Sequence, residues 1–163
     1  LLHLPYLCGV MNPYWDANAR GAFVGLSSFH HRGHFYRSIL EGIAFEQRLA
    51  INDVEKSMGT RVHDFVAIGG GAANDLWCHV LADITGRNIC IPENTEASGL
   101  GAAIAAAVGM GWYRTFKVAA DKMTRIRKVV RPEKQNHKQY QQFSVVYKRI
   151  YTSLKRMGEV KKT

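Results

Sequence analysis

The fold is decided by Phe65-Val66-Ala67-Ile68-Gly69-Gly70-Gly71-Ala72-Ala73-Asn74, where four apolar residues run into three glycines. A continuous apolar run of this kind predicts a strand that is buried on both faces of a sheet. The glycines predict a tight turn, and Asn74 or Asp75 predicts the cap of a helix that reaches about Thr85. The segment therefore predicts a strand, a turn and a helix, in that order.

The residues that follow repeat this alternation of strand and helix. Gly86 ends the first helix, residues 88–91 predict a second strand, and Pro92 closes it. Residues 97–108 predict a helix of small side chains, a composition that indicates close packing against a sheet. This order predicts an α/β fold with a mostly parallel sheet flanked by helices.

Longer helices are predicted on either side of this core. Residues 31–58 form the first, whose apolar stripe is expected to contain Phe35, Ile39, Ile43, Ala50 and Val54. Residues 139–157 form the second, whose apolar face is expected to contain Tyr140, Phe143, Tyr147, Ile150 and Leu154. Residues 1–19 predict mostly loop, and residues 21–26 predict a short strand. Residues 112–130 predict a short helix and a strand-like run.

The net charge of +9 belongs to the C-terminal part of the chain. Residues 1–111 carry 7 Lys and Arg against 10 Asp and Glu, whereas residues 112–163 carry 15 against 3. The basic segment lacks the aromatic-interleaved strands and the helix-turn-helix pattern of nucleic-acid-binding modules. We therefore expect its charges to lie on a solvated helical face, and we expect no nucleic acid as a partner.

Cysteine usage and hydropathy indicate a cytoplasmic protein without a membrane partner. Cys8, Cys78 and Cys90 form no CxxC pair, so neither a zinc site nor a disulfide framework is predicted. The longest apolar run, residues 100–108, is about half the length of a membrane span. Residues 1–6 lack both the basic start of a signal peptide and an initiator Met, so we interpret the chain as a fragment.

The glycine turn has the composition of an anion site. Glycines let the backbone approach a phosphate, and the first N–H groups of the following helix are expected to point toward it. Three consecutive glycines also cost backbone entropy that a plain turn does not require. A dinucleotide site is the alternative, because Gly69, Gly71 and Glu93 approach the GxGxxG pattern and its distant acid. Asn74, however, occupies the third glycine position, where a side chain obstructs helix packing.

Two early segments resemble the FGGY family of carbohydrate kinases. Residues 21–26 (GAFVGL), followed seven residues later by 34–41 (HFYRSILE), are similar to the second signature of that family. The match continues through residues 40–45. Residues 12–20 are similar to the loop that leads into this signature, especially in the xylulose kinases.

Two later segments resemble the same family in the expected order. Gly69-Gly70-Gly71-Ala72, with Leu76-Trp77 and Ala82-Asp83 after it, is similar to the adenosine motif of the superfamily. Glu96-Ala97 and residues 100–103 are similar to its last helix. Together the matches cover roughly residues 10–110.

The resemblance implies a ribonuclease H-like, actin-like ATPase domain that uses ATP and Mg²⁺. It implies that residues 1–111 are the C-terminal nucleotide-binding domain of a sugar kinase, incomplete and without its N-terminal domain. Residues 112–163 are then a basic helical extension packed on that domain. The residues that bind the nucleotide are expected to be Gly69, Gly70, Gly71, Ala72 and Asn74.

The resemblance also implies which parts lie elsewhere. The aspartate that takes the proton from the sugar hydroxyl, and most phosphate-binding turns, belong to the upstream part in this family, so this chain is expected to hold no catalytic residue and to be inactive alone. The expected partners are a sugar, most simply a pentulose such as xylulose, and the N-terminal domain; a homodimer is left open. A non-catalytic nucleotide-binding domain of the same fold is the alternative.

Two departures leave the sugar open. Residues 9–12 replace the acidic and basic pair that xylulose kinases usually carry in this loop. Asn74-Asp75 is instead similar to the glycerol kinase branch, in which an asparagine contacts adenine.

Two further sets of residues receive a structural interpretation. His30, His31 and His34 have the spacing of a helical metal site, but no nearby carboxylate or cysteine completes it, and no metal ligand is predicted. Glu41 and Glu46 are five residues apart and therefore lie on different faces of a helix, so they are not expected to act as a catalytic pair.

Overall fold

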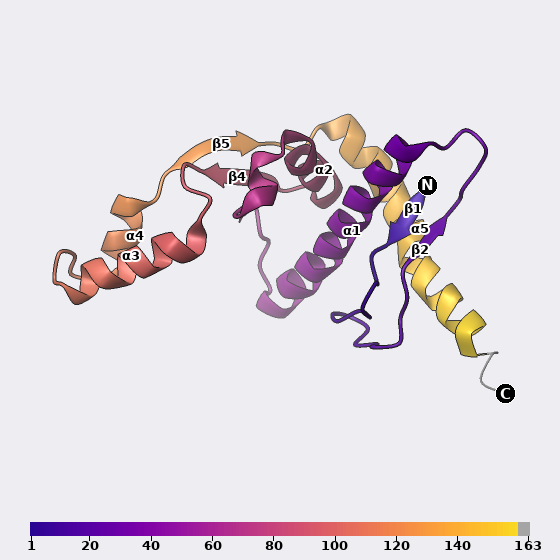
Figure 1. The fold of residues 1–163 in the computed structure, drawn as a ribbon, viewed down its shortest axis with the longest axis horizontal. Helices are drawn as coiled ribbons and strands as arrows, with labels where there is room; N and C mark the ends of the chain where they lie inside the picture. The colour runs from indigo at the N-terminus through magenta and orange to yellow at the C-terminus, as the bar shows by residue number, and fades with distance from the viewer. Residues whose placement is uncertain (160–163) are drawn as a thin grey trace. The chain divides into compact units, whose positions relative to one another are not determined.

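The computed structural model describes residues 1–159, which form two compact units (Figure 1). Unit 1 contains Leu1–Val62, Asp83–Gly86 and the chain from Pro132 on, and unit 2 contains His63–Ala82 and Arg87–Arg131. Residue 111, where the sequence predicts the end of the nucleotide-binding domain, lies within unit 2, and that boundary stays a prediction. No helix within residues 1–159 combines the length and the apolar character needed to cross a membrane.

Unit 1 is built from two helices and a two-stranded sheet. Strands β1 (Leu2–Leu4) and β2 (Ala22–Val24) pair antiparallel. Helix α1 (Arg32–Met58) lies against β1, as does helix α5 (Lys134–Glu159). The strand predicted at residues 21–26 and the helix predicted at 31–58 are confirmed. Strand β1 was not predicted, and α5 begins five residues earlier than predicted.

The buried face of α1 differs from the predicted stripe. Ile39 and Ile43 are exposed, whereas Ser38, Gly42 and Phe45 are buried. The reason is the close approach of β1, because a Cβ atom added at Gly42 would collide with the backbone carbonyl oxygen of His3. Only glycine fits at this crossing, and the helix is rotated accordingly about its axis.

A half-buried carboxylate, that of Glu46, is bonded to two buried tyrosines of unit 1. One oxygen of Glu46 accepts hydrogen bonds from the hydroxyl groups of Tyr147, at 2.6 Å, and Tyr6, at 2.9 Å. Burial raises the pKa of the Glu46 carboxyl, while the two phenol donors act in the opposite direction. Burial, and next the charge of Glu46, raise the pKa values of both phenols. These bonds join the segment after β1 to α1 and α5.

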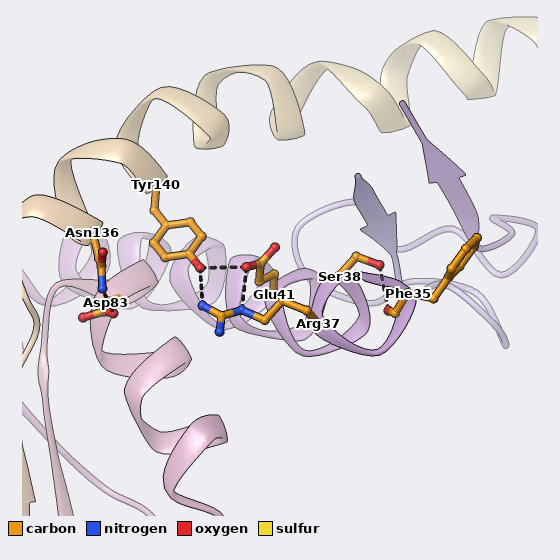
Figure 2. Close-up of polar contacts among 7 residues, drawn as sticks. All are labelled: Phe35, Arg37, Ser38, Glu41, Asp83, Asn136 and Tyr140. Carbon is orange, nitrogen blue, oxygen red and sulfur yellow. Dashed lines mark hydrogen bonds and ion pairs between the residues drawn. The ribbon is translucent and has the colours of Figure 1, made fainter. Parts of the chain in front are cut away.

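A second polar cluster joins α1 to α5 (Figure 2). The Tyr140 hydroxyl donates to Glu41 at 2.7 Å and accepts a hydrogen bond from Arg37 at 2.8 Å. Arg37 also pairs with Glu41 at 2.8 Å, one helical turn along α1. Each of the three side chains therefore bonds to the other two.

The start of α5 is capped by the last turn of α2 (Asp75–Thr85). The buried Asp83 carboxylate accepts hydrogen bonds from the backbone N–H of Glu133, at 2.7 Å, and from the Asn136 side chain, at 2.9 Å (Figure 2). A ring nitrogen of His137 lies 2.7 Å from the Asp83 carbonyl oxygen. A negative charge at a helix start is favourable because it opposes the helix dipole.

The predicted apolar face of α5 is confirmed in part. Tyr147 and Ile150 are buried, and Tyr140 and Leu154 are half-buried, but Phe143 is 49% exposed. Tyr151, which was not predicted, is buried and donates a hydrogen bond to the Asp16 carboxylate at 2.6 Å.

Unit 2 contains a three-stranded mixed sheet and its helices. The strands lie in the order β3–β4–β5, with β3 and β4 parallel and β4 and β5 antiparallel. The strand–helix–strand order predicted around the glycine turn is confirmed. The elements are β3 (Asp64–Val66), the 3₁₀ turn η1 (Gly70–Ala73), α2, β4 (Asn88–Pro92), α3 (Ala97–Gly109), α4 (Phe116–Met123) and β5 (Ile126–Val130).

The sheet of unit 2 is covered on one face. Ile89 and Ile91 of β4 pack with Cys78 and Ala82 of α2, and Phe65 of β3 is packed against them. Alternate residues of β3 point to the other face, where Val66 is 60% exposed. The prediction that this strand is buried on both faces is therefore wrong for the described chain, in which β3 pairs with β4 alone.

Helix α3 also differs from its predicted environment. It lies beside α4, as Figure 1 shows, and most of its small residues face solvent. A Cβ atom added at Gly99 or Gly101 would have no heavy atom within 4 Å. The close packing of this helix against a sheet is thus not formed within residues 1–159.

Candidate functional site

The glycine turn is held by bonds at both of its ends. The N–H of Ala67 donates to the carbonyl of Cys90 at 2.9 Å and so extends the pairing of β3 with β4. At Gly69 the chain turns with φ +74° and ψ −173°, a combination that is essentially limited to glycine. The Gly69 N–H donates to the carbonyl of Thr95 at 2.9 Å, which ties the turn to the loop after β4.

The glycines lead into the 3₁₀ turn η1, not directly into α2. The N–H of Ala72 donates to Gly69 and the N–H of Asn74 donates to Gly71, each at 3.1 Å. Helix α2 then begins at Asp75. The expectation that the first N–H groups of the long helix face the glycines therefore needs correction, since one 3₁₀ turn separates them.

The first turn of α2 already carries a negative charge. Asp75 accepts a hydrogen bond from the Lys128 ammonium of β5 at 2.7 Å. The Lys128 partner holds the pKa of the Asp75 carboxyl below its ordinary value. An anion that approaches from the glycines thus has the backbone of η1 as its first donor, with the Lys128 charge near the start of α2.

Asn74 and Trp77 hold the turn at its junction with α2. The side-chain oxygen of Asn74 accepts the N–H of Trp77 at 3.0 Å, which confirms the predicted cap. The Trp77 indole lies against Gly71, where an added Cβ atom would be 3.3 Å from two ring atoms. Ala72 is buried, and the Cys78 thiol donates to its carbonyl at 3.7 Å.

The outer side of the turn is open. A Cβ atom added at Gly69 or Gly70 would meet no heavy atom within 4 Å. The N–H groups of Gly70 and Gly71 open η1 and therefore have no acceptor within that turn. A backbone with free donors and no side chain above it can approach phosphate oxygens closely.

The other candidate residues have structural roles in the described chain. Glu41 and Glu46 accept hydrogen bonds from tyrosine hydroxyls, and His31 and His34 bond to backbone at the start of α1. Within residues 1–159 no three His, Cys, Asp or Glu side chains are placed to hold a metal ion.

Sequence reasoning missed two residues that position the turn. Thr95 acts through its backbone carbonyl, which any residue type could supply, so the sequence carries no signal for it. Lys128 lies 53 residues from Asp75, and only the register of β5 against β4 brings the two together.

Comparison with known proteins identifies a family whose match includes the glycine turn. Residues 1–110 match the FGGY family of carbohydrate kinases, C-terminal domain. The chain is 37% identical over 163 residues to the xylulose kinase of Bacillus subtilis (strain 168). This alignment covers 100% of the chain and 32% of that protein. It is 38% identical over 117 residues to the glycerol kinase of Citrifermentans bemidjiense, covering 72% of the chain and 24% of that protein.

A solved structure shows the same arrangement. The ligand-bound xylulose kinase from Lactobacillus acidophilus superposes with a TM-score of 0.84 at 30% identity, covering 94% of the chain and 31% of that protein. The chain thus spans about a third of the length of the curated relatives that it matches.

We predict that alanine has opposite effects at two neighbouring glycines. Gly69→Ala should lower the free energy of unfolding by about 1–3 kcal/mol, because its backbone conformation excludes a Cβ atom. Gly70→Ala should leave it unchanged or raise it by up to about 1 kcal/mol, because the space is open and the unfolded chain loses freedom. Urea denaturation of both variants is the measurement. Equal losses at the two positions would contradict the described geometry.

Proposed function

The chain belongs to the C-terminal domain of the FGGY family of carbohydrate kinases and has the α/β, actin-like ATPase fold of that family, and on this premise we propose that it is the ATP-binding part of a sugar kinase. The whole protein would transfer the γ-phosphate of ATP to a sugar hydroxyl. Xylulose is the favoured sugar because the chain is 37% identical over its full length to a xylulose kinase.

The open glycine turn carries this proposal. Gly69 sets the backbone direction, and Gly70 and Gly71 present N–H groups where phosphate oxygens can approach. Ala72 is buried and anchors the turn in the core of unit 2. Asn74 uses its side-chain oxygen for Trp77, which leaves its amide NH₂ to donate to adenine or ribose. The family match favours this interpretation over the dinucleotide site suggested by Gly69, Gly71 and Glu93.

The nucleotide fits the described residues, whereas Mg²⁺ has no ligand set among them. The turn offers neutral backbone donors, which suit phosphate. No cluster of carboxylates is available for the ion within residues 1–159. We therefore assign the Mg²⁺ ligands and the general base to the upstream part of the protein, and no catalytic residue to this chain. Bound Mg²⁺ would neutralise the charge that develops on the phosphates.

The domain boundaries expected from the sequence are kept as part of the proposal. Residues 1–111 would supply the nucleotide-binding domain, and residues 112–163 a basic helical extension packed on it. Half-buried Tyr140 and buried Tyr147 support a structural role for the basic segment, because its helix uses them to pack on α1.

We propose that the upstream part of the protein covers the open face of the unit 2 sheet. Parallel strands are normally buried on both faces, yet Val66 and Ile68 of the β3 segment are 60% and 55% exposed. Together with Leu100, Ile104 and Ile126 they line a largely apolar cavity of about 380 Å³. The exposed small residues of α3 form a surface that a further element can approach closely. The homodimer that the sequence leaves open is not part of this proposal.

The activity is tested by comparing the full-length protein with this chain alone. A coupled assay for ADP release, run with a panel of ketoses and polyols, should show turnover of the full-length protein with xylulose. The 163-residue chain should show none, because the proposal places the base for the sugar hydroxyl in the upstream part of the protein. Turnover by the chain alone at ordinary kinase rates, or a full-length protein inactive on every sugar, would contradict the proposal.

Nucleotide binding at the turn is tested by Gly70→Asp in the full-length protein. The substitution places a side chain and a negative charge where the phosphates approach, so ATP affinity measured by calorimetry should fall by about a hundredfold or more, roughly 3 kcal/mol. Gly70→Ala is the matched control for the fold, because a Cβ atom added at this glycine would meet no heavy atom within 4 Å. Unchanged ATP affinity in a folded Gly70→Asp protein would show that the turn is only structural.

The covered sheet face is tested by Val66→Asp in two contexts. In the chain alone the free energy of unfolding should change by about 0.5 kcal/mol or less, because the side chain is mostly exposed. In the full-length protein the same charge would be buried, and the loss should exceed about 2 kcal/mol. Thermal and urea unfolding of both forms measure the difference. An equally small effect in both would show that no upstream residue packs on Val66.

A further inference from the structure

Helix α1 begins with an unusual pair of capping side chains. His31 is the N-cap, and its Nδ1 atom accepts the N–H of Gly33 at 3.2 Å. In return the N–H of His31 donates to Nδ1 of His34 at 3.2 Å. This is the geometry of a capping box, in which the two positions are usually Ser or Thr and Glu or Gln. Here both are histidine.

A third histidine stabilises the segment just before the helix. The N–H of Ser27 donates to Nδ1 of His30 at 2.9 Å, and the hydroxyl and carbonyl oxygens of Ser27 lie 2.9 and 3.3 Å from the same atom. The His30 ring stacks on the ring of Phe29, with centroids 4.2 Å apart. All three rings therefore use the same atom, Nδ1, to accept a backbone N–H.

These three contacts require uncharged rings. A neutral imidazole with its proton on Nε2 can accept at Nδ1, whereas an imidazolium donates at both nitrogens and accepts at neither. Protonation would thus remove the acceptor from the N–H groups of His31 and Gly33, whereas a protonated His30 would donate to the Ser27 carbonyl instead of accepting the Ser27 N–H. It would also place positive charge at the end of α1 where the helix dipole is itself positive.

The three histidine rings lie close to one another, so the charge of one ring affects the protonation of His34. The His34 ring centroid lies 4.2 Å from that of His31 and 5.3 Å from that of His30. Burial, followed by the charges of His31 and His30 and a lesser effect of the Leu1 amino group, lowers the pKa of His34. The first turn of α1 contains no acidic residue, and the helix opens with Arg32.

Strand β1, which packs on α1, brings one more titratable group toward this end. His3 lies on β1, and its ring stacks on Phe23, whose ring in turn contacts Phe35 of α1. Burial lowers the pKa of His3, and its Nδ1 atom lies 3.3 Å from the Ala22 carbonyl oxygen. The residues named here that carry charge near this end are therefore bases, and their charges disfavour protonation of His34.

We propose that the start of α1 is a pH-dependent cap, closed while His30, His31 and His34 are neutral and opened by their protonation. For His34 the pKa is lower in the folded chain than in the unfolded chain, so its contribution is fully present above about pH 6.5 and is lost as the pH falls below that value. Opening would release the segment from Ser27 to His34, which joins β2 to α1. This inference does not depend on the proposed kinase activity.

The test is peptide-level hydrogen exchange of the full-length protein between pH 8 and pH 5.5, with rates corrected for the intrinsic effect of pH. Protection of the backbone amides within residues 27–38 should fall by about fivefold or more across this range, which corresponds to the loss of one N-cap. Protection in the middle of α1 should change much less.

A variant with both His31→Ser and His34→Gln rebuilds the capping box from groups that do not titrate, so its protection should stay nearly constant with pH. His63→Gln, at an exposed histidine of unit 2, should keep the pH dependence of the natural protein. Equal pH dependence in the double variant and the natural protein would overturn the proposal. So would ¹⁵N-histidine spectra at pH 8 that place the ring protons of His31 and His34 on Nδ1, and this second measurement decides the question if the double variant does not fold.

Discussion

Unit 1 depends on one half-buried carboxylate, that of Glu46. Glu46 accepts hydrogen bonds from Tyr6 and Tyr147, and these two contacts bring together segments that are 40 and 101 residues away along the chain. A charge removed from water is costly unless its hydrogen-bonding capacity is used. The two phenols satisfy that need, and each is itself too buried to be satisfied by water. Phenylalanine at residue 6 or 147 would supply the ring but not the donor.

The position of Glu46 also explains why α1 is oriented as it is. Gly42 precedes it by one turn and lets β1 cross the helix, and Phe45 stacks on Tyr147 with ring centroids 4.7 Å apart. The apolar residues Ile39 and Ile43 are then left on another face. Polar bonding and close backbone approach, more than the count of apolar residues, decide which side of this helix is inside.

The sequence predicts the elements well and their environments less well. The bounds of α1, α2, β4 and α3 follow from Gly59, Gly86, Pro92 and the apolar spacing, which are local signals. The buried face of α1 could not be found from periodicity, because a stripe through Ile39 and one through Ser38 have the same spacing. Strand β1 has only 3 residues, too few for any pattern, and it is defined by its partner β2.

The candidate site shows the same division between local and distant information. The glycine turn and the Asn74 cap were predicted because the signal for each lies in a few consecutive residues. The 3₁₀ turn, the Thr95 carbonyl and the Lys128–Asp75 pair depend on strand register and on backbone groups, which residue identity does not reveal. Burial of Val66 was predicted from the habits of parallel sheets, and the described chain lacks the elements that would cover it.

The open space around Gly70 separates selection for folding from selection for binding, which usually act on the same residue. Folding makes no demand on the residue at this position, since an added side chain would touch nothing in the chain. Gly69, one residue earlier, is constrained by the backbone whether or not anything binds. In a relative without the proposed nucleotide site, position 70 is therefore free to change while position 69 remains glycine. A comparison of the two positions would thus separate what the fold requires from what the proposed ligand requires.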